Sequence, residues 1–84
     1  MIPIEQVRAL VERAFPESRI ELSSPMGDDH HFQLLIVSER FAGKSMVQQH
    51  QMVYQALGEA MKESIHALSL RTFTPEQWRK AQGG

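Results

Sequence analysis

Residues 32–38 read Phe32-Gln33-Leu34-Leu35-Ile36-Val37-Ser38, and most of them are β-branched or large apolar residues. A run this short that is apolar at nearly every position is typical of a strand covered on much of both faces. We therefore expect this run to lie at the centre of a sheet.

The residues before this run predict a helix, a strand and a loop. Apolar residues recur at intervals of three and four from Pro3 to Phe15, which indicates an amphipathic helix that Pro16 ends. Residues 19–23 alternate polar and apolar as a half-buried strand does. The breaker-rich residues 24–29 predict a short exposed loop, so the first two strands should pair antiparallel.

A second helix is expected after the turn Ala42-Gly43-Lys44, because Ser45 and Gln48 have the spacing of a capping box. Gly58 interrupts the helical pattern and should divide it into two segments. One apolar stripe is expected along this stretch, formed by Met46, Val47, His50, Val53, Tyr54, Leu57 and Met61.

Residues 67–73 complete the pattern as a third strand, and Thr74-Pro75-Glu76-Gln77 predicts the start of a short last helix that carries Trp78. The expected order is α-β-β-α-α-β-α, an α+β fold. The helical crossover between the second and third strands, about 25 residues, is long enough for a parallel connection. Parallel pairing would bring the beginnings of both strands, marked by His31 and His66, to one edge of the sheet.

Composition limits what the chain can do. Its 84 residues predict a single domain, 1–84, and its formal net charge of -1 gives no overall field that would attract nucleic acid or membrane. The sequence lacks an apolar run of membrane-spanning length and a signal-peptide pattern, so the expected location is the cytoplasm. Zero cysteines exclude thiol catalysis and any iron-sulfur site made of the chain's own thiolates. No arrangement of nucleophile, base and orienting acid is recognisable, and an enzyme is not expected.

Several motifs together resemble the BolA family over about residues 30 to 78. These are Phe41-Ala42-Gly43-Lys44-Ser45, the spacing from Val47 to His50, Val53-Tyr54, Leu57, Ile65-His66-Ala67-Leu68 and Thr74-Pro75-Glu76-Gln77-Trp78. In its shortness and its bare N-terminus, the chain resembles the compact acid-stress subgroup more than the longer founding member of the family. The resemblance implies a fold like the class II KH domain, with three helices on a three-stranded mixed sheet. Because the glycine-x-x-glycine clamp is absent, nucleic-acid binding by the usual KH route is not supported.

The same resemblance implies a role in iron-sulfur trafficking or sensing. His66 matches the family histidine that ligates a 2Fe-2S cluster shared with a monothiol glutaredoxin and glutathione, with no cluster on the isolated chain. His31 matches the proposed second ligand. Adjacent strand residues point to opposite faces, so His30 and His31 should not both reach one metal. His31 is preferred, and the choice between the two stays open. The alternative for His66 is a structural histidine at a helix C-terminus, and His50 is expected to be partly buried and structural.

A DNA-binding stress-response regulator is the alternative function. It would use the helix after Gly43, with Arg40, Lys44, Gln48, Gln49 and His50 facing phosphates. Two cations neutralise few phosphates, so such binding should be weak and strongly dependent on salt. A homodimer is the other partner state left open. Phe73 and Trp78 either cover the end of the sheet or form a partner surface.

Overall fold

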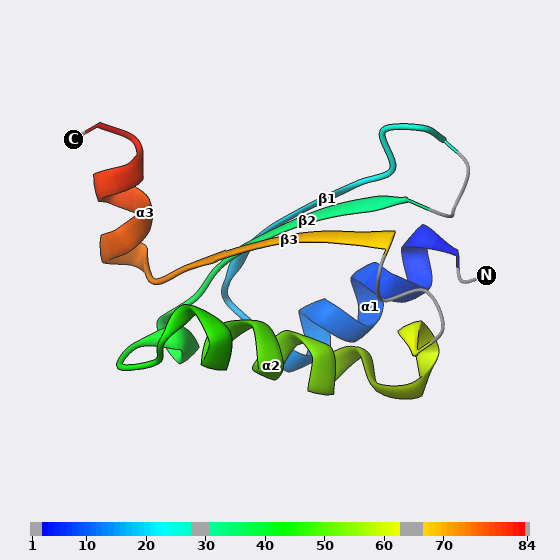
Figure 1. Cartoon of the computed structure of the whole chain (residues 1–84), viewed down its shortest axis with the longest axis horizontal. Helices are drawn as coiled ribbons and strands as arrows, with labels where there is room; N and C mark the ends of the chain where they lie inside the picture. The colour runs from blue at the N-terminus through cyan, green and yellow to red at the C-terminus, as the bar shows by residue number, and fades with distance from the viewer. Residues whose placement is uncertain (1–2, 28–30, 63–66, 84) are drawn as a thin grey trace.

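The central strand is the one that residues 32–38 predict. In the computed structural model, which describes residues 3–27, 31–62 and 67–83, strand β2 (Phe32–Val37) lies between β1 (Arg19–Ser23) and β3 (Leu68–Phe73). It pairs antiparallel with β1 and parallel with β3 (Figure 1). All of its residues except Gln33 are buried, which confirms a strand covered on both faces. The α+β class and the mixed three-stranded sheet are therefore confirmed.

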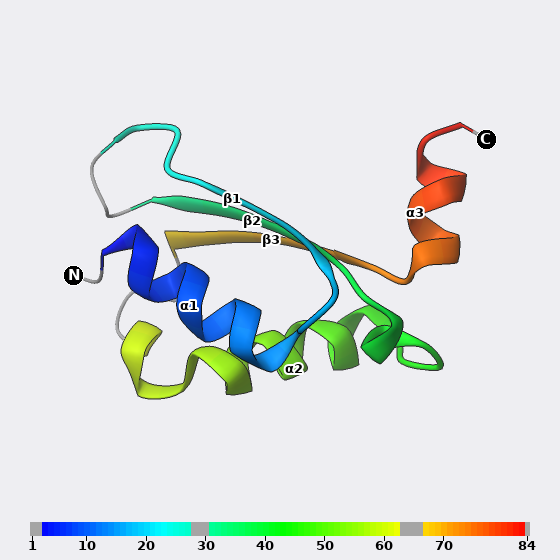
Figure 2. The ribbon, with the colours of Figure 1, turned by 180° about the vertical axis from the view of Figure 1, so that it is seen from behind.

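Two helices cover one face of this sheet. Figures 1 and 2 show α1 (Ile4–Ala14) and α2 (Met46–Leu57) side by side on the same side of the strands. The core between them and the sheet is apolar and consists of Val7, Val11, Phe15, Leu22, Phe32, Leu34, Ile36, Phe41, Val53 and Leu57. Phe41 closes the short 3-10 helix η1 (Glu39–Phe41), and its ring lies 5.1 Å from that of Phe15. Burying this face supplies the main driving force for folding.

The apolar stripe expected on α2 is confirmed at Val53 and Leu57 and is wrong at Met46 and Val47. The buried residues of this helix are Gln49, Val53 and Leu57, which follow one another at intervals of four. Met46 and Val47 are instead 68% and 66% exposed. The physical reason is that the buried face of α2 is centred on Gln49, Val53 and Leu57, and the amide of Gln49 can be buried because Thr72 and the Lys44 carbonyl satisfy it.

Gly58 ends α2 as expected and divides the helical stretch. Its backbone dihedral angles, φ 53° and ψ -140°, belong to a region that glycine alone occupies readily. The second segment is a 3-10 helix, η2 (Gly58–Met61), instead of an α-helix. The capping box of Ser45 and Gln48 at the start of α2 is also confirmed.

The last helix, α3 (Pro75–Ala81), lies at the end of β3. Both the capping box of Thr74 and Gln77 and the first-turn proline are confirmed. Figures 1 and 2 show α3 rising beyond the sheet on the side opposite α1 and α2. That second face of the sheet, called the open face below, has no other helix of the described residues over it.

The corrected register of α2 predicts unequal costs for two identical substitutions. Val53 is fully buried and Val47 is exposed. We expect Val53→Ala to lower the free energy of unfolding by about 2 kcal/mol and Val47→Ala to change it by less than about 0.5 kcal/mol. Both variants gain the same helix propensity, so the difference between their urea-unfolding free energies reports burial alone. Equal losses would contradict the register.

Candidate functional site

The parallel pairing of β2 with β3 brings the beginnings of the two strands to one edge. Phe32 is paired with Leu68, so His31 precedes one member of this pair and Ala67 the other. Figure 1 shows both strand starts at the end of the sheet away from α3. His31 is exposed and Ala67 is partly buried. The predicted edge is present, and we call it the strand-start edge.

The two other histidines predicted near this edge, His30 and His66, lie outside the described residues. Their predicted roles are therefore not tested, and neither is the choice between His30 and His31. Within residues 3–27, 31–62 and 67–83, no three histidine, cysteine, aspartate or glutamate side chains gather where they would hold a metal ion. Across the same residues, no helix has both the length and the apolar character needed to cross a membrane.

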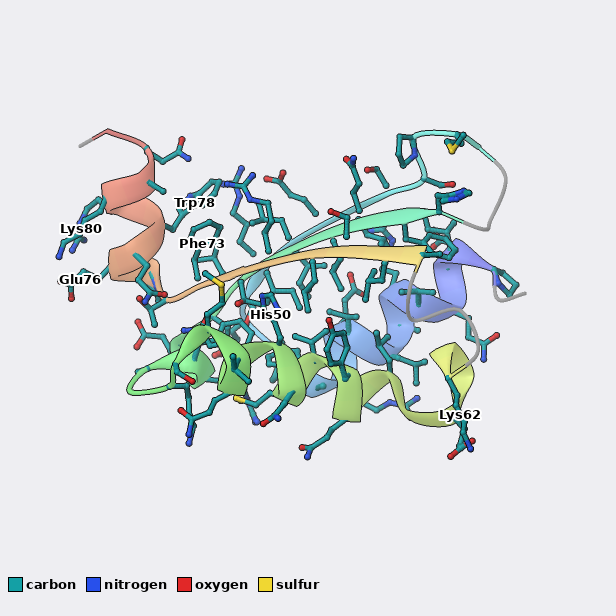
Figure 3. All side chains as sticks on the ribbon, in the orientation of Figure 1. His50, Lys62, Phe73, Glu76, Trp78 and Lys80 are labelled. Atoms are coloured by element: carbon teal, nitrogen blue, oxygen red, sulfur yellow. The ribbon has the colours of Figure 1, made fainter. Side chains whose placement is uncertain are left out.

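His50 lies away from the strand-start edge. It is partly buried in the first half of α2, and its ring meets that of Tyr54 edge-on, with 6.4 Å between the ring centroids. Figure 3 shows His50 on the part of α2 nearer to α3. The partial burial and the ring contact agree with the structural role expected for His50.

The alternative nucleic-acid surface is only partly present. Arg40, Lys44 and Gln48 are exposed, and within the described part of the chain no carboxylate pairs with either cation. Gln49 is wrong as a phosphate-facing residue, because its side chain is only 2% exposed. It lies on the face of α2 that packs against β3, one turn before Val53.

Gln49 is instead the centre of a buried hydrogen-bond network. Its Oε1 accepts a 2.7 Å hydrogen bond from the Thr72 hydroxyl on β3. Its Nε2 donates to the Lys44 carbonyl at 3.2 Å and to Gln77 Oε1 at 3.4 Å. One amide therefore joins α2, β3 and the cap of α3. Its spacing of four and eight residues from Val53 and Leu57 places it on their helix face, but the partners that make its burial favourable come from other elements.

A second cluster of side chains lies at the α3 end of the open face, and the sequence did not predict it as a unit. The rings of Phe73 and Trp78 meet at 60° with centroids 5.3 Å apart, as Figure 3 shows between β3 and α3. The Arg19 guanidinium lies 5.3 Å from the centre of the Trp78 ring, and that of Arg71 lies 5.3 Å from the centre of the Phe73 ring. Side chains alternate between the two faces along β1 and β3, so the register places Arg19, Arg71 and Phe73 on the same face. This alternation was the only sign of the cluster in the sequence.

Comparison with known proteins agrees with this fold. The family profile described as BolA-like protein matches residues 11–77. The chain is 37% identical to BolA-like protein 1 of Mus musculus, covering 93% of this chain and 63% of that protein, so it spans less than two thirds of that relative. It is 35% identical to the DNA-binding transcriptional regulator BolA of Escherichia coli, covering 93% of this chain and 77% of that protein.

A solved structure has the same fold. The structure of a BolA protein homologue from Coxiella burnetii superimposes with a TM-score of 0.73 at 35% identity, covering 94% of this chain and 99% of that one. The fold is thus that of a small α+β domain with helices on one face of a mixed sheet. The chain belongs to the BolA-like protein family.

The Gln49 network predicts a stability loss that a surface glutamine does not share. Gln49→Leu leaves the Thr72 hydroxyl without its acceptor, and we expect it to lower the free energy of unfolding by about 1–3 kcal/mol. Gln51→Leu makes the same chemical change at an exposed position of α2 and should cost less than about 0.5 kcal/mol.

The double variant Gln49→Leu/Thr72→Val tests the pairing itself, because it removes both hydrogen-bonding groups. It should lose about 1 kcal/mol less than the sum of the two single variants in urea unfolding. Additive losses would show that the two side chains do not interact.

Proposed function

We propose that this chain is an adaptor that binds a monothiol glutaredoxin and completes the coordination of a shared 2Fe-2S cluster with His66 and His31. The thiolates would come from the glutaredoxin active-site cysteine and from glutathione. The observation that carries the proposal is the parallel register of β2 and β3 at the strand-start edge. Membership of the BolA-like family supports it, because the family resemblance implies this partner and this cluster.

The register supports a joint role for the two histidines. In the sequence, His31 stands one residue before Phe32, and His66 stands two residues before Leu68. Phe32 and Leu68 are paired neighbours in the sheet, and the central strand is buried on both faces. A ligand placed directly before such a strand is held by a rigid element, which is what a metal site requires. His31 is also exposed, so a partner protein can reach its imidazole.

The residue types suit a shared site that releases its cargo. Imidazole replaces thiolate on iron in some 2Fe-2S centres, and it must lose its proton to bind, so binding is sensitive to pH. With zero cysteines, the chain depends on thiolates from a partner. The bound cluster would supply a transferable iron-sulfur unit, and the role would be delivery, storage or sensing in the cytoplasm without substrate turnover.

The test is anaerobic cluster reconstitution on a monothiol glutaredoxin with glutathione, followed by visible circular dichroism. We expect the added chain to produce a new spectrum, because a change of ligand alters the electronic environment of the iron. The His66→Ala variant should fail to produce it, and His31→Ala should weaken or alter it. His50→Ala is the matched control, because His50 lies away from the strand-start edge, and it should behave as the unmodified chain does.

Two results would count against this proposal. Loss of the new spectrum in all three histidine variants alike, with far-ultraviolet circular dichroism showing that each variant is folded, would deny His66 and His31 a specific role as ligands. No spectral change with the unmodified chain would exclude the shared cluster and leave the DNA-binding alternative.

That alternative has one specific observation in its favour. The Escherichia coli relative is named a DNA-binding transcriptional regulator, and this chain exposes Arg40, Lys44 and Gln48 around the start of α2. A salt titration separates the two functions. Binding of duplex DNA through these cations should weaken steeply with added salt, whereas the glutaredoxin complex should depend on cluster and glutathione.

A further inference from the structure

The open face of the sheet carries three rows of side chains that the register defines. Alternation places every second residue of each strand on this face. From the α3 end towards the strand-start edge, the rows are Arg19–Val37–Phe73, Glu21–Leu35–Arg71 and Ser23–Gln33–Ser69. The side chains packed in the core under α1 and α2 belong to the alternate positions.

The first row, extended by Trp78 from α3, forms an aromatic platform. Phe73 and Trp78 are both only partly buried, and each has a guanidinium against its ring. The two arginines come from the two edge strands, and the tryptophan comes from the helix that rises beside the face (Figures 1 and 3). Four side chains from three elements therefore present aromatic and guanidinium planes at one place.

The charge of this face is positive. Glu21 is the single acidic residue in the three rows, and its Oε2 accepts a 2.7 Å hydrogen bond from Arg19 Nε. Arg71 has no carboxylate partner among the residues that the structure describes. An anionic group that approaches the middle of the sheet therefore meets a cation whose charge is not already neutralised.

Beyond Arg71 the face is hollow and polar. A depression of about 300 Å³ is lined by Ser23, Gln33, Ser69 and Arg71 and also by Glu21, whose carboxylate is hydrogen-bonded to Arg19. Two hydroxyls and one amide, all exposed, offer hydrogen-bond donors and acceptors along the third row. The face thus passes from an aromatic platform to a free cation and then to a polar row.

We propose that the open face, bounded by α3, binds single-stranded nucleic acid. Unpaired bases stack on aromatic rings and on guanidinium planes, which Phe73, Trp78 and their arginines supply. A backbone phosphate pairs with Arg71, and the polar row hydrogen-bonds to sugar and base. This site goes beyond the proposed adaptor function. Its aromatic platform lies at the end of the sheet opposite His31, and its polar row extends towards the strand-start edge.

Single strands fit this face better than the other anionic or planar partners. In a duplex the bases are stacked inside and cannot reach Phe73 or Trp78. A second copy of this chain would bring Arg71 against a like-charged face. An acidic peptide would satisfy Arg71 but would leave the aromatic platform without a stacking partner.

The tryptophan gives a direct readout, because Trp78 is the only one in the chain. The experiment titrates the full chain with oligothymidylate and oligouridylate of equal length and follows indole fluorescence. We expect saturable quenching and a logarithmic affinity that falls with the logarithm of salt concentration, with a slope of about -0.7 for each phosphate bound. Equal binding of both oligomers assigns the affinity to base and phosphate, and stronger binding of the RNA adds a contact of the 2′-hydroxyl with the polar row.

Variants locate the binding surface. Arg71→Gln should weaken binding several-fold and make the salt slope shallower by about 0.7. Phe73→Leu should weaken it by about tenfold through lost stacking. Arg13→Gln removes the same charge from an exposed position of α1, on the other side of the sheet, and should leave binding unchanged. Lys44→Gln should also leave the affinity for single strands unchanged.

Three results would overturn the proposal. They are no quenching by either oligomer, unchanged affinity of Arg71→Gln, and weakening by Lys44→Gln in place of Arg71→Gln, which would assign binding to α2. Phe73→Leu alters a partly buried ring and can unfold the chain. If it does, the affinity of Arg71→Gln alone decides whether the open face is the binding surface.

Discussion

The parallel pairing of β2 with β3 is the constraint on which the rest of the structure depends. Parallel neighbours cannot be joined by a tight turn, so the chain must cross back over the sheet, and α2 makes that crossing. The helix brings its buried face, Gln49, Val53 and Leu57, against the core, and the hydrogen bond from Thr72 to Gln49 ties it to β3. Because both strands run in the same direction, the residues directly before them lie at one edge of the sheet, and the residues directly after them lie at the other.

Each of these two edges has its own chemistry. The strand-start edge presents His31, a ligand type that binds iron when deprotonated. At the opposite edge, α3 follows β3 directly and places Trp78 against Phe73 and beneath the Arg19 guanidinium. α1 and α2 occupy the other face of the sheet, and among the described residues no helix lies across the open face (Figure 2). A domain this small can therefore offer a metal ligand and an aromatic, cationic surface without either obstructing the other.

Much of this arrangement could be predicted from the sequence, because it follows from local rules. The strand at residues 19–23, the capping boxes at Ser45 and Thr74 and the break at Gly58 depend on neighbouring residues alone. The face that α2 buries could not be read from hydropathy, because burial of Gln49 is favourable only when Thr72 and the Lys44 carbonyl satisfy its amide. The aromatic platform was missed for a similar reason. Arg19 and Trp78 are far apart in the sequence, and only the strand register and the direction of α3 bring them together.

The central claim is that this chain supplies nitrogen ligands to a cluster whose thiolates belong to a partner. The most direct measurement is pulsed electron paramagnetic resonance of the reduced cluster, formed from unlabelled glutaredoxin and glutathione with this chain carrying isotope-labelled histidine nitrogen. The account predicts hyperfine coupling to the labelled nitrogens, part of which disappears in His66→Ala and part in His31→Ala. A reduced cluster in the complex without any coupling to labelled nitrogen would contradict the account, because all of its ligands would then come from the partner and glutathione.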